Sequence, residues 1–290
     1  MTNSELVIIH QNINQKFTNK KDIRNITEGD KTPESIVKNV LNVTKDIKAD
    51  VIVFTEFRVL DNYCKAIQEP LIDAGYEIFR NTNLLNPKNK NVKRIAQVLI
   101  AIKSDIIAKQ DAEICCLELD QNDAIYSKAS RLTYDNIGIT PNYLRVDLKL
   151  NGKPYSIIGT RIRLLNSGGE EERAFRAKQL KVLLNSIPKD RELIIVGDFN
   201  ISPSDCFRKK DSKWHFDEIY LKSLDESDLI CKWPVDGNSP CGSEHKLDHI
   251  IFSNKLKVNE VEYIGGKYCQ TTNTINLPDH PILYAKIKTV

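Results

Sequence analysis

The chain has 290 residues, of which 41% are hydrophobic and 28% are charged. This composition supplies a sizeable hydrophobic core and excludes an intrinsically disordered protein. The formal net charge of +3 excludes a protein that coats nucleic acid through general positive charge, so any polyanion has to be bound locally.

No apolar run approaches the roughly 18 residues that a membrane span needs, and the polar start of the chain lacks a signal-peptide pattern. We therefore expect a cytoplasmic protein that does not insert into membranes. The length allows one or two domains, because large sandwiches reach about 250 residues as one unit. We expect one domain over residues 1–290.

Short apolar runs rich in Val and Ile predict strands that are buried on both faces. We expect six of them, at residues 6–9, 51–54, 98–102, 155–160, 193–196 and 250–252. Residues 143–150 alternate between apolar and polar side chains, which is typical of a strand with one solvated face. The Asn151-Gly152 pair that follows predicts a two-residue hairpin turn.

Apolar residues at helical spacing predict helices over 33–48 and 170–187, and a weaker pattern predicts a third over 61–74. Segments 81–93 and 202–212 are rich in Asn, Lys, Ser and Asp, so we expect surface loops there. Hairpins mixed with crossover helices favour an α/β layered sandwich.

Polar residues stand at the ends of the predicted strands. Asn12 follows the first strand, Glu56 the second, and Asp198 and Asn200 the fifth. A single Asp in such a place is commonly a turn residue, because its side chain accepts turn hydrogen bonds. Strand ends of a layered sheet converge, however, and oxygen ligands from Asp, Glu and Asn suit Mg²⁺ or Mn²⁺. Together these residues therefore indicate a site.

Five motifs carry a resemblance to a known superfamily. They are Gln11-Asn12-Ile13-Asn14, Asp50-Val51-Ile52-Val53-Phe54-Thr55-Glu56, Gly197-Asp198-Phe199-Asn200, Lys246-Leu247-Asp248-His249-Ile250 and Pro278-Asp279-His280-Pro281. In this order they resemble the endonuclease/exonuclease/phosphatase superfamily over nearly the whole chain. The resemblance implies a four-layer α/β sandwich, with two facing mixed β-sheets flanked by helices. It also implies a divalent-metal site and hydrolysis of a phosphate ester.

The resemblance implies roles for the metal and the attacking water. Glu56 is implied as the main ligand of Mg²⁺ or Mn²⁺, with Asn12 beside it and Asp279 as a further candidate. Asp198 matches the catalytic aspartate that orients or deprotonates the attacking water. Asn200 would face the same way as Asp198 in an extended strand and hold the scissile phosphate or that aspartate. Asn12 and Asn200 are thus also candidates for substrate binding.

His280 matches the histidine that contacts the phosphate and takes part in proton transfer. Its near-neutral reference pKa suits either role. Asp248, in the match to the family's Arg-Ile-Asp, is the implied partner that orients His280.

The chain departs from the family pattern at two places. Gln11 stands where the family usually has Trp, which alters packing or hydrogen bonding near Asn12. Arg161 stands where many members have His or Tyr near the leaving group. A guanidinium stays protonated and can clamp a phosphate, so we expect Arg161 to bind substrate and stabilise transition-state charge. If the local alignment shifts by two residues, Arg163 takes the position expected for Arg161. For either residue, a surface arginine without a catalytic role is the alternative interpretation.

Leaving-group protonation would then come from a metal-bound water or an acidic side chain. We expect a nuclease, because basic residues in the predicted loops could track a sugar-phosphate backbone, with an aromatic ring for stacking. These residues are Lys88, Lys90, Lys93, Arg94, Lys209, Lys210, Lys213 and Trp214. Ordinary solvated loop charge is the alternative. Arg173 and Arg176 could face substrate or pair with Glu170–Glu172.

Other functions and sites stay open. The alternative enzyme is a phosphatase or phosphodiesterase for a small molecule or an inositol or lipid headgroup, and a catalytically silent binding module is a third interpretation. A zinc site could form from Cys231, Cys241, His245 and His249, although their spacing fits no compact zinc motif. The sequence does not decide whether the substrate is DNA or RNA, whether cleavage is endonucleolytic or exonucleolytic, or which oligomeric state the protein adopts.

Overall fold

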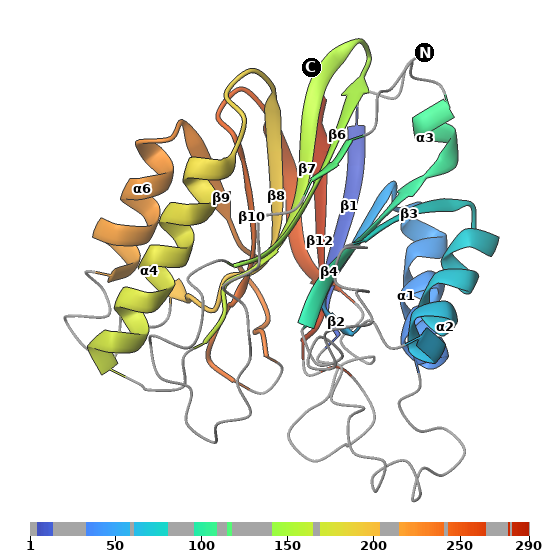
Figure 1. Ribbon diagram of the computed structural model, residues 1–290, viewed down its shortest axis with the longest axis horizontal. Helices are drawn as coiled ribbons and strands as arrows, with labels where there is room; N and C mark the ends of the chain where they lie inside the picture. The colour runs from blue at the N-terminus through green and yellow to red at the C-terminus, as the bar shows by residue number, and fades with distance from the viewer. Residues whose placement is uncertain are drawn as a thin grey trace, which may run out of the picture.

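Two six-stranded sheets face each other in the described part of the chain (Figure 1). The computed structural model describes residues 5–13, 33–58, 61–80, 96–108, 115–117, 141–164, 169–203, 215–240, 243–264, 278 and 280–289. The first sheet has, in spatial order, β11 (Lys257–Ile264), β12 (Ile282–Lys288), β1 (Glu5–Asn12), β2 (Val51–Arg58), β4 (Ala96–Lys103) and β3 (Tyr76–Arg80). The second has β5 (Cys115–Leu117), β6 (Asn142–Leu150), β7 (Lys153–Arg161), β8 (Glu192–Asp198), β10 (Asp248–Ser253) and β9 (Leu229–Lys232).

Both sheets are mixed. β1 runs parallel to β2 and β7 runs parallel to β8, whereas the other ladders between these strands are antiparallel. The hairpin between β6 and β7 turns at Asn151 and Gly152, which have φ values of 53° and 78°. Both lie in the left-handed region that a two-residue hairpin turn requires, so this sequence prediction is confirmed.

Helices cover the outer faces of the two sheets (Figure 1). The segments are α1 (Pro33–Ile47), α2 (Asp61–Asp73), α3 (Ser104–Ala108), α4 (Gly169–Ser186), the π-helical η5 (His215–Leu221) and α6 (Lys222–Asp225). In Figure 1, α1 and α2 flank the first sheet, and α4 and α6 flank the second. The predicted four-layer α/β sandwich is therefore confirmed. Among the described helices, none is both long and apolar enough to cross a bilayer.

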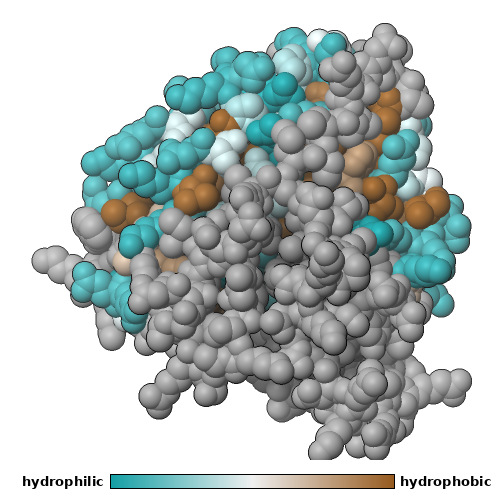
Figure 2. All heavy atoms as spheres, viewed as in Figure 1, coloured by the Kyte–Doolittle hydropathy of each residue, from teal (hydrophilic) through white to brown (hydrophobic). Residues whose placement is uncertain are grey.

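Alternation along the strands separates the core from the helix-covered faces. One apolar cluster fills the space between the sheets and takes every second residue, including Leu6, Ile8, Val51, Val53, Ile194, Val196, Ile250 and Phe252. The residues between them, such as Ile9, Ile52 and Ile195, belong to two further clusters beneath the helices. On the face that Figure 2 shows, the described side chains are mostly hydrophilic, with scattered hydrophobic spots. Each strand therefore has an inner face that points at the opposite sheet.

The six predicted core strands and all three predicted helices are present, with bounds that differ by a few residues. The sequence analysis missed the edge strands β3, β5, β9 and β11, and also β12, which lies inside the first sheet. β11 carries Lys257, Glu260 and Glu262, and such charged residues protect an edge strand from aggregation but hide its apolar pattern. The predicted loop over 81–93 lies outside the described residues, as does most of the one over 202–212.

His249 of β10 is buried in an aromatic cluster beneath η5. Its Nε2 lies 2.7 Å from the Lys246 carbonyl oxygen, and its Nδ1 lies 2.8 Å from the Tyr220 hydroxyl. Because a carbonyl oxygen only accepts, Nε2 carries the proton and Nδ1 accepts from Tyr220. The ring stacks on Phe199 with centroids 5.6 Å apart. Burial lowers the pKa of His249 to about 4, so the ring is neutral at pH 7.

Replacing His249 by Gln should reduce the loss of stability that acid causes. The folded-state pKa of His249 lies below its ordinary value of 6.5, so the unfolded chain binds the proton first as the pH falls. The stability contributed by the neutral ring is complete above pH 6.5 and declines toward pH 4, by up to about 1.4 kcal/mol per pH unit. In urea denaturation, the unfolding free energy of His249→Gln should fall less over this range than that of the wild type.

Phe252, a buried ring in the core between the sheets, provides the control. Phe252→Leu removes no titratable group and should keep the wild-type dependence of unfolding free energy on pH. Equal slopes for the wild type and His249→Gln would show that the folded protein does not hold this ring neutral.

Candidate active site

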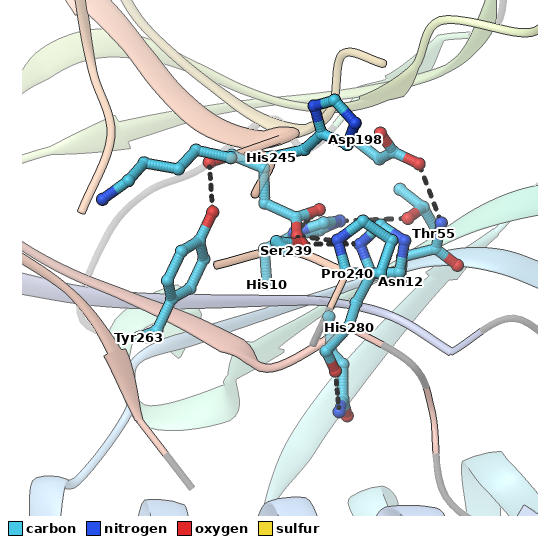
Figure 3. A network of polar contacts seen from close by, with 12 residues as sticks. His10, Asn12, Thr55, Asp198, Ser239, Pro240, His245, Tyr263 and His280 are labelled. Atoms are coloured by element: carbon cyan, nitrogen blue, oxygen red, sulfur yellow. Dashed lines mark hydrogen bonds and ion pairs between the residues drawn. The ribbon is translucent and has the colours of Figure 1, made fainter. Parts of the chain in front are cut away.

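The side chains that face the opposite sheet are apolar along most of each central strand and become polar at one end of it. Continuing the alternation of the core along each strand places these side chains between the sheets, at one end of the sandwich. Figure 3 shows several of them pointing toward one another. They are His10 and Asn12 of β1, Thr55 of β2, Arg161 of β7, Asp198 of β8 and Asp248 of β10.

Glu56 reaches the same end of the sandwich through a β-bulge in β2. Thr55 pairs with Val98 and Phe57 pairs with Gln97, so Glu56 has no opposite residue in β4. Its φ of 56° lies in the left-handed region, which residues other than glycine rarely adopt. The extra residue returns Phe57 to the buried layer beneath the helices and turns Glu56 out of the ladder.

A polar bridge joins Glu56 of the first sheet to Asp198 of the second. Asn12 Nδ2 donates to Asp198 Oδ2 at 2.8 Å and to Glu56 Oε1 at 3.3 Å. The Arg161 guanidinium contacts the same two carboxylates, with Nη2 2.6 Å from Glu56 Oε1 and Nε 3.7 Å from Asp198 Oδ2. One amide and one permanent cation thus hold together two carboxylates that would otherwise repel.

Asp198 is buried and accepts hydrogen bonds on both oxygens. It is preceded by Gly197, where a Cβ would stand 1.8 Å from the Thr160 carbonyl oxygen, so only glycine lets β8 end this close to β7. Burial raises the pKa of Asp198 to about 6, although His280 and Arg161 act to lower it. A carboxylate with a pKa near neutrality suits proton transfer from water, and this role stays a prediction.

Asn200 contacts Asp198, but the expectation of an extended strand is wrong. β8 ends at Asp198, and Asn200 has a φ of 51°. The chain turns because the Asn200 backbone N donates to Asp198 Oδ1 at 2.9 Å, while its Nδ2 donates to the Ile162 carbonyl at 2.6 Å. Arg176 of α4 donates to the Asn200 carbonyl and lies 3.7 Å from Glu172. Asn200 therefore supports Asp198, and Arg176 supports Asn200.

His280 and Asp248 form a buried pair. His280 Nδ1 lies 2.9 Å from Asp248 Oδ2 and 2.8 Å from Ser239 Oγ, which also donates to Asp248 Oδ2. Burial alone would raise the pKa of Asp248, but the charge and hydrogen bond of His280, together with His10 and Ser239, hold it below its ordinary value. An ionised carboxylate only accepts, so His280 Nδ1 carries the proton. The geometry agrees with the expectation that Asp248 orients His280.

The sequence analysis did not single out three members of this network, His10, Thr55 and Ser239. His10 Nε2 lies 3.0 Å from Thr55 Oγ1, and His10 Nδ1 lies 3.5 Å from Asp248 Oδ1. The position of His10, two residues before Asn12 and hence on the same face of β1, was the available signal. Ser239 carries no such signal, because it lies in an irregular segment.

Gln11 supports the site from outside it, whereas Arg163 is hydrogen-bonded to α4. Gln11 Nε2 donates to the His280 carbonyl at 3.0 Å, so the residue in the family's Trp position holds the His280 backbone. The Arg163 backbone exchanges two hydrogen bonds of 2.9 Å with the Gln179 side chain. Arg163 is only 3% exposed, which leaves little surface for a substrate. Arg161, and not Arg163, occupies the position beside Glu56 and Asp198.

The donor atoms at Glu56 suit a divalent cation that keeps much of its water. Asn12 and Arg161 both contact Oε1, so Glu56 Oε2 is the oxygen outside these two contacts. Mg²⁺ commonly takes one or two carboxylates and retains several waters. Within the described ranges, no group of three or more His, Cys, Asp and Glu side chains could form a metal cage. Asn12 presents its amide nitrogen here, so binding through Oδ1 requires the amide to turn, and Asp279 lies outside the described residues.

The remaining sequence-based candidates either find no support in the structure or lie outside the described residues. The zinc alternative finds no support, because His249 uses both ring nitrogens within the protein and Cys231 lies against Tyr220. Cys241, which completes that set, lies outside the described residues. So do the basic residues predicted to contact nucleic acid, which are Lys88, Lys90, Lys93, Arg94, Lys209, Lys210 and Lys213, together with Trp214.

Solved structures show the same fold. An endonuclease/exonuclease/phosphatase family protein from Bacteroides thetaiotaomicron matches with a TM-score of 0.62 at 14% identity, over 99% of this chain and 98% of that one. ANGEL2, a 2′,3′-cyclic phosphatase in complex with adenosine-2′,3′-vanadate, matches with 0.62 at 16%, over 98% and 95%. D. rerio TDP2 complexed with a single-strand DNA product matches with 0.55 at 15%, over 99% and 100%.

The chain has the fold of this superfamily. The resemblance inferred from the five motifs is thus confirmed at the level of the fold, over nearly the whole chain. No family model and no curated protein sequence matches the chain. Roles for individual residues therefore rest on the geometry described above.

The contact between Asp248 and His280 should be visible in the NMR spectrum of the imidazole ring. We expect a proton on Nδ1 with a strongly downfield chemical shift, because this proton is shared with a buried carboxylate. Asp248→Asn should move the signal upfield by weakening that bond. Ser243→Ala is the control, because its hydroxyl bonds the Pro240 carbonyl and not the pair. An unchanged signal in Asp248→Asn would contradict the assignment.

Proposed function

We propose that the protein is a divalent-metal-dependent phosphodiesterase that cleaves nucleic acid, that is, a nuclease. The observation that carries this proposal is the meeting of Glu56, Asp198 and the Asp248–His280 pair at one end of the sandwich, with Arg161 between the first two. These side chains supply an oxygen ligand, a base, an imidazole and a fixed positive charge. Each of these four kinds of group can contribute to the hydrolysis of a phosphate ester.

The residues divide the chemistry among them. Asp198, with a pKa raised to about 6 by burial, orients the attacking water and accepts its proton. His280, aligned by Asp248, contacts the phosphate, and Arg161 stabilises the charge that develops on it. Glu56 would hold Mg²⁺ or Mn²⁺, and such an ion polarises a phosphoryl oxygen and offsets its charge. Arg161 cannot protonate the leaving group at neutral pH.

Nucleic acid is the substrate class that the comparisons favour. One protein of this fold is complexed with a single-strand DNA product and another with adenosine-2′,3′-vanadate, so the same fold accommodates nucleotides. A phosphodiester fits the permanent charge of Arg161, which can pair with a phosphate oxygen. The cytoplasmic location expected from the sequence stays a prediction.

Metal removal and one substitution test the proposal together. Purified protein with Mg²⁺ or Mn²⁺ should degrade single-stranded DNA or RNA, and EDTA should abolish this activity. Asp198→Asn should lower kcat by at least about a hundredfold, because general base catalysis contributes roughly that much or more. The exposed Asp190 provides the matched control, and Asp190→Asn should retain wild-type kcat.

Plasmid DNA, single-stranded DNA, RNA and inositol phosphates should be compared in parallel. Turnover of nucleic acid with inert inositol phosphates supports the proposal. Turnover of inositol phosphates alone would replace the nuclease by a small-molecule phosphatase. Folded protein that cleaves none of them with either metal would favour a binding module.

Replacing Arg161 by Met should separate metal binding from turnover. The guanidinium lies 2.6 Å from Glu56, so its removal should tighten Mn²⁺ binding without substrate about three- to tenfold, as expected for a partly screened charge. The same change should lower kcat/KM, because the phosphate loses its cationic partner. Electron paramagnetic resonance of free Mn²⁺ measures the first effect and hydrolysis the second.

Arg191→Met is the control for Arg161→Met. Arg191 is also partly exposed and paired with carboxylates, Asp147 and Asp190, but neither belongs to the site. This variant should match the wild type in both measurements. Weaker Mn²⁺ binding in Arg161→Met would show that the arginine does not oppose the metal at Glu56.

A further inference from the structure

A second histidine contacts the aspartate that orients His280. His10 contacts the other carboxylate oxygen of Asp248, with Nδ1 3.5 Å from Oδ1, whereas His280 and Ser239 both contact Oδ2. Figure 3 shows His10, Ser239 and His280 close to one another. The two oxygens of Asp248 therefore face different partners.

The contact joins two buried polar atoms. His10 and Asp248 are both 0% exposed. Neither His10 Nδ1 nor Asp248 Oδ1 makes a hydrogen bond within the described part of the chain. A buried polar atom that faces no partner destabilises the folded state, so the contact between these two atoms offsets part of the cost of burying both.

The other ring nitrogen fixes how His10 lies. Its Nε2 is 3.0 Å from Thr55 Oγ1, one residue before Glu56. Because Asp248 is acceptor-only when ionised, the proton of the neutral ring belongs on Nδ1, and Nε2 accepts from the Thr55 hydroxyl. His10 thus connects the strand that carries Glu56 to the carboxylate that serves His280.

We propose that His10 is a positioning residue, which anchors Oδ1 of Asp248 so that Oδ2 stays directed at His280. The imidazole touches neither substrate nor metal in this proposal and acts only through Asp248. Without it, the carboxylate can rotate and share its charge differently between its two oxygens. The inference rests on the proposed function for its catalytic consequence, but its structural part can be measured without any turnover.

The first measurement is the NMR signal of the His280 Nδ1 proton at one fixed pH. His10→Leu removes both polar contacts and should move this signal upfield. His10→Asn, whose amide can reproduce the donor at Nδ1, should keep it close to the wild-type position. His249→Gln is the control for the loss of a buried histidine, because His249 bonds Tyr220 and Lys246 instead, and it should leave the signal unmoved.

The second measurement is a double-mutant cycle on hydrolysis. His10→Leu should lower kcat about tenfold with little change in KM, and His10→Asn should recover most of it. In an Asp248→Asn background, His10→Leu should have almost no further effect, because the two residues act in series. Thr55→Val removes only the hydroxyl that faces His10. It should shift the His280 signal and lower kcat in the same direction as His10→Leu, but by a smaller amount.

Thr55→Val also serves if His10→Leu fails to fold. Two results would overturn the inference: an unmoved His280 signal in folded His10→Leu and Thr55→Val, or a His10→Leu effect on kcat that is undiminished in the Asp248→Asn background. If the wild type proves to have no hydrolytic activity, the proposed function fails, while the NMR comparison still decides whether His10 holds Asp248.

Discussion

Buried negative charge is the constraint around which this site is organised. Asp198 and Asp248 are almost completely buried, and Glu56 lies within reach of the same amide and guanidinium as Asp198. A carboxylate removed from water needs donors to remain ionised. Donors from both sheets meet this need, so the polar contacts that make the site also join the two sheets where the apolar core ends.

The two buried aspartates respond to their surroundings in opposite ways. They are direct neighbours, paired across β8 and β10. Burial raises the pKa of Asp198, whereas His280, His10 and Ser239 keep that of Asp248 below its ordinary value in spite of burial. Environments that push the pKa values of neighbouring groups apart commonly mark a division of acid–base roles. In the proposed mechanism, Asp198 exchanges a proton with water, and Asp248 stays charged and aligns the His280 imidazole.

The sequence was informative wherever a residue's environment follows from periodicity. Strands rich in Val and Ile predicted the layered fold, and polar residues at the strand ends singled out Asn12 and Asp198, whose expected roles came from the superfamily resemblance. His10 obeys the same rule and was overlooked, because a histidine inside an apolar run also fits a core position. The edge strand β11 was not predicted because its charged side chains interrupt the alternation, and β5 was not predicted because it has only three residues.

Other features of the site depend on tertiary contacts that no local pattern encodes. The chain turns at Asn200 because this residue donates hydrogen bonds to Asp198 and to the Ile162 carbonyl. The sequence alone equally allows an extended chain at this position, two residues after the strand. Ser239 comes from an irregular segment and meets Asp248 only in the folded protein. The choice between Arg161 and Arg163 likewise required the register of β7 against β8, which pairs Arg161 with Asp198.

The bulge at Glu56 separates architecture from chemistry. Thr55 and Phe57 occupy the faces they would have if they were consecutive, so the ladder between β2 and β4 would be regular without the residue between them. The ladder does not require Glu56, whereas the candidate site does. Loss of this one residue would therefore leave the sheet intact and remove from the site the carboxylate that Asn12 and Arg161 contact.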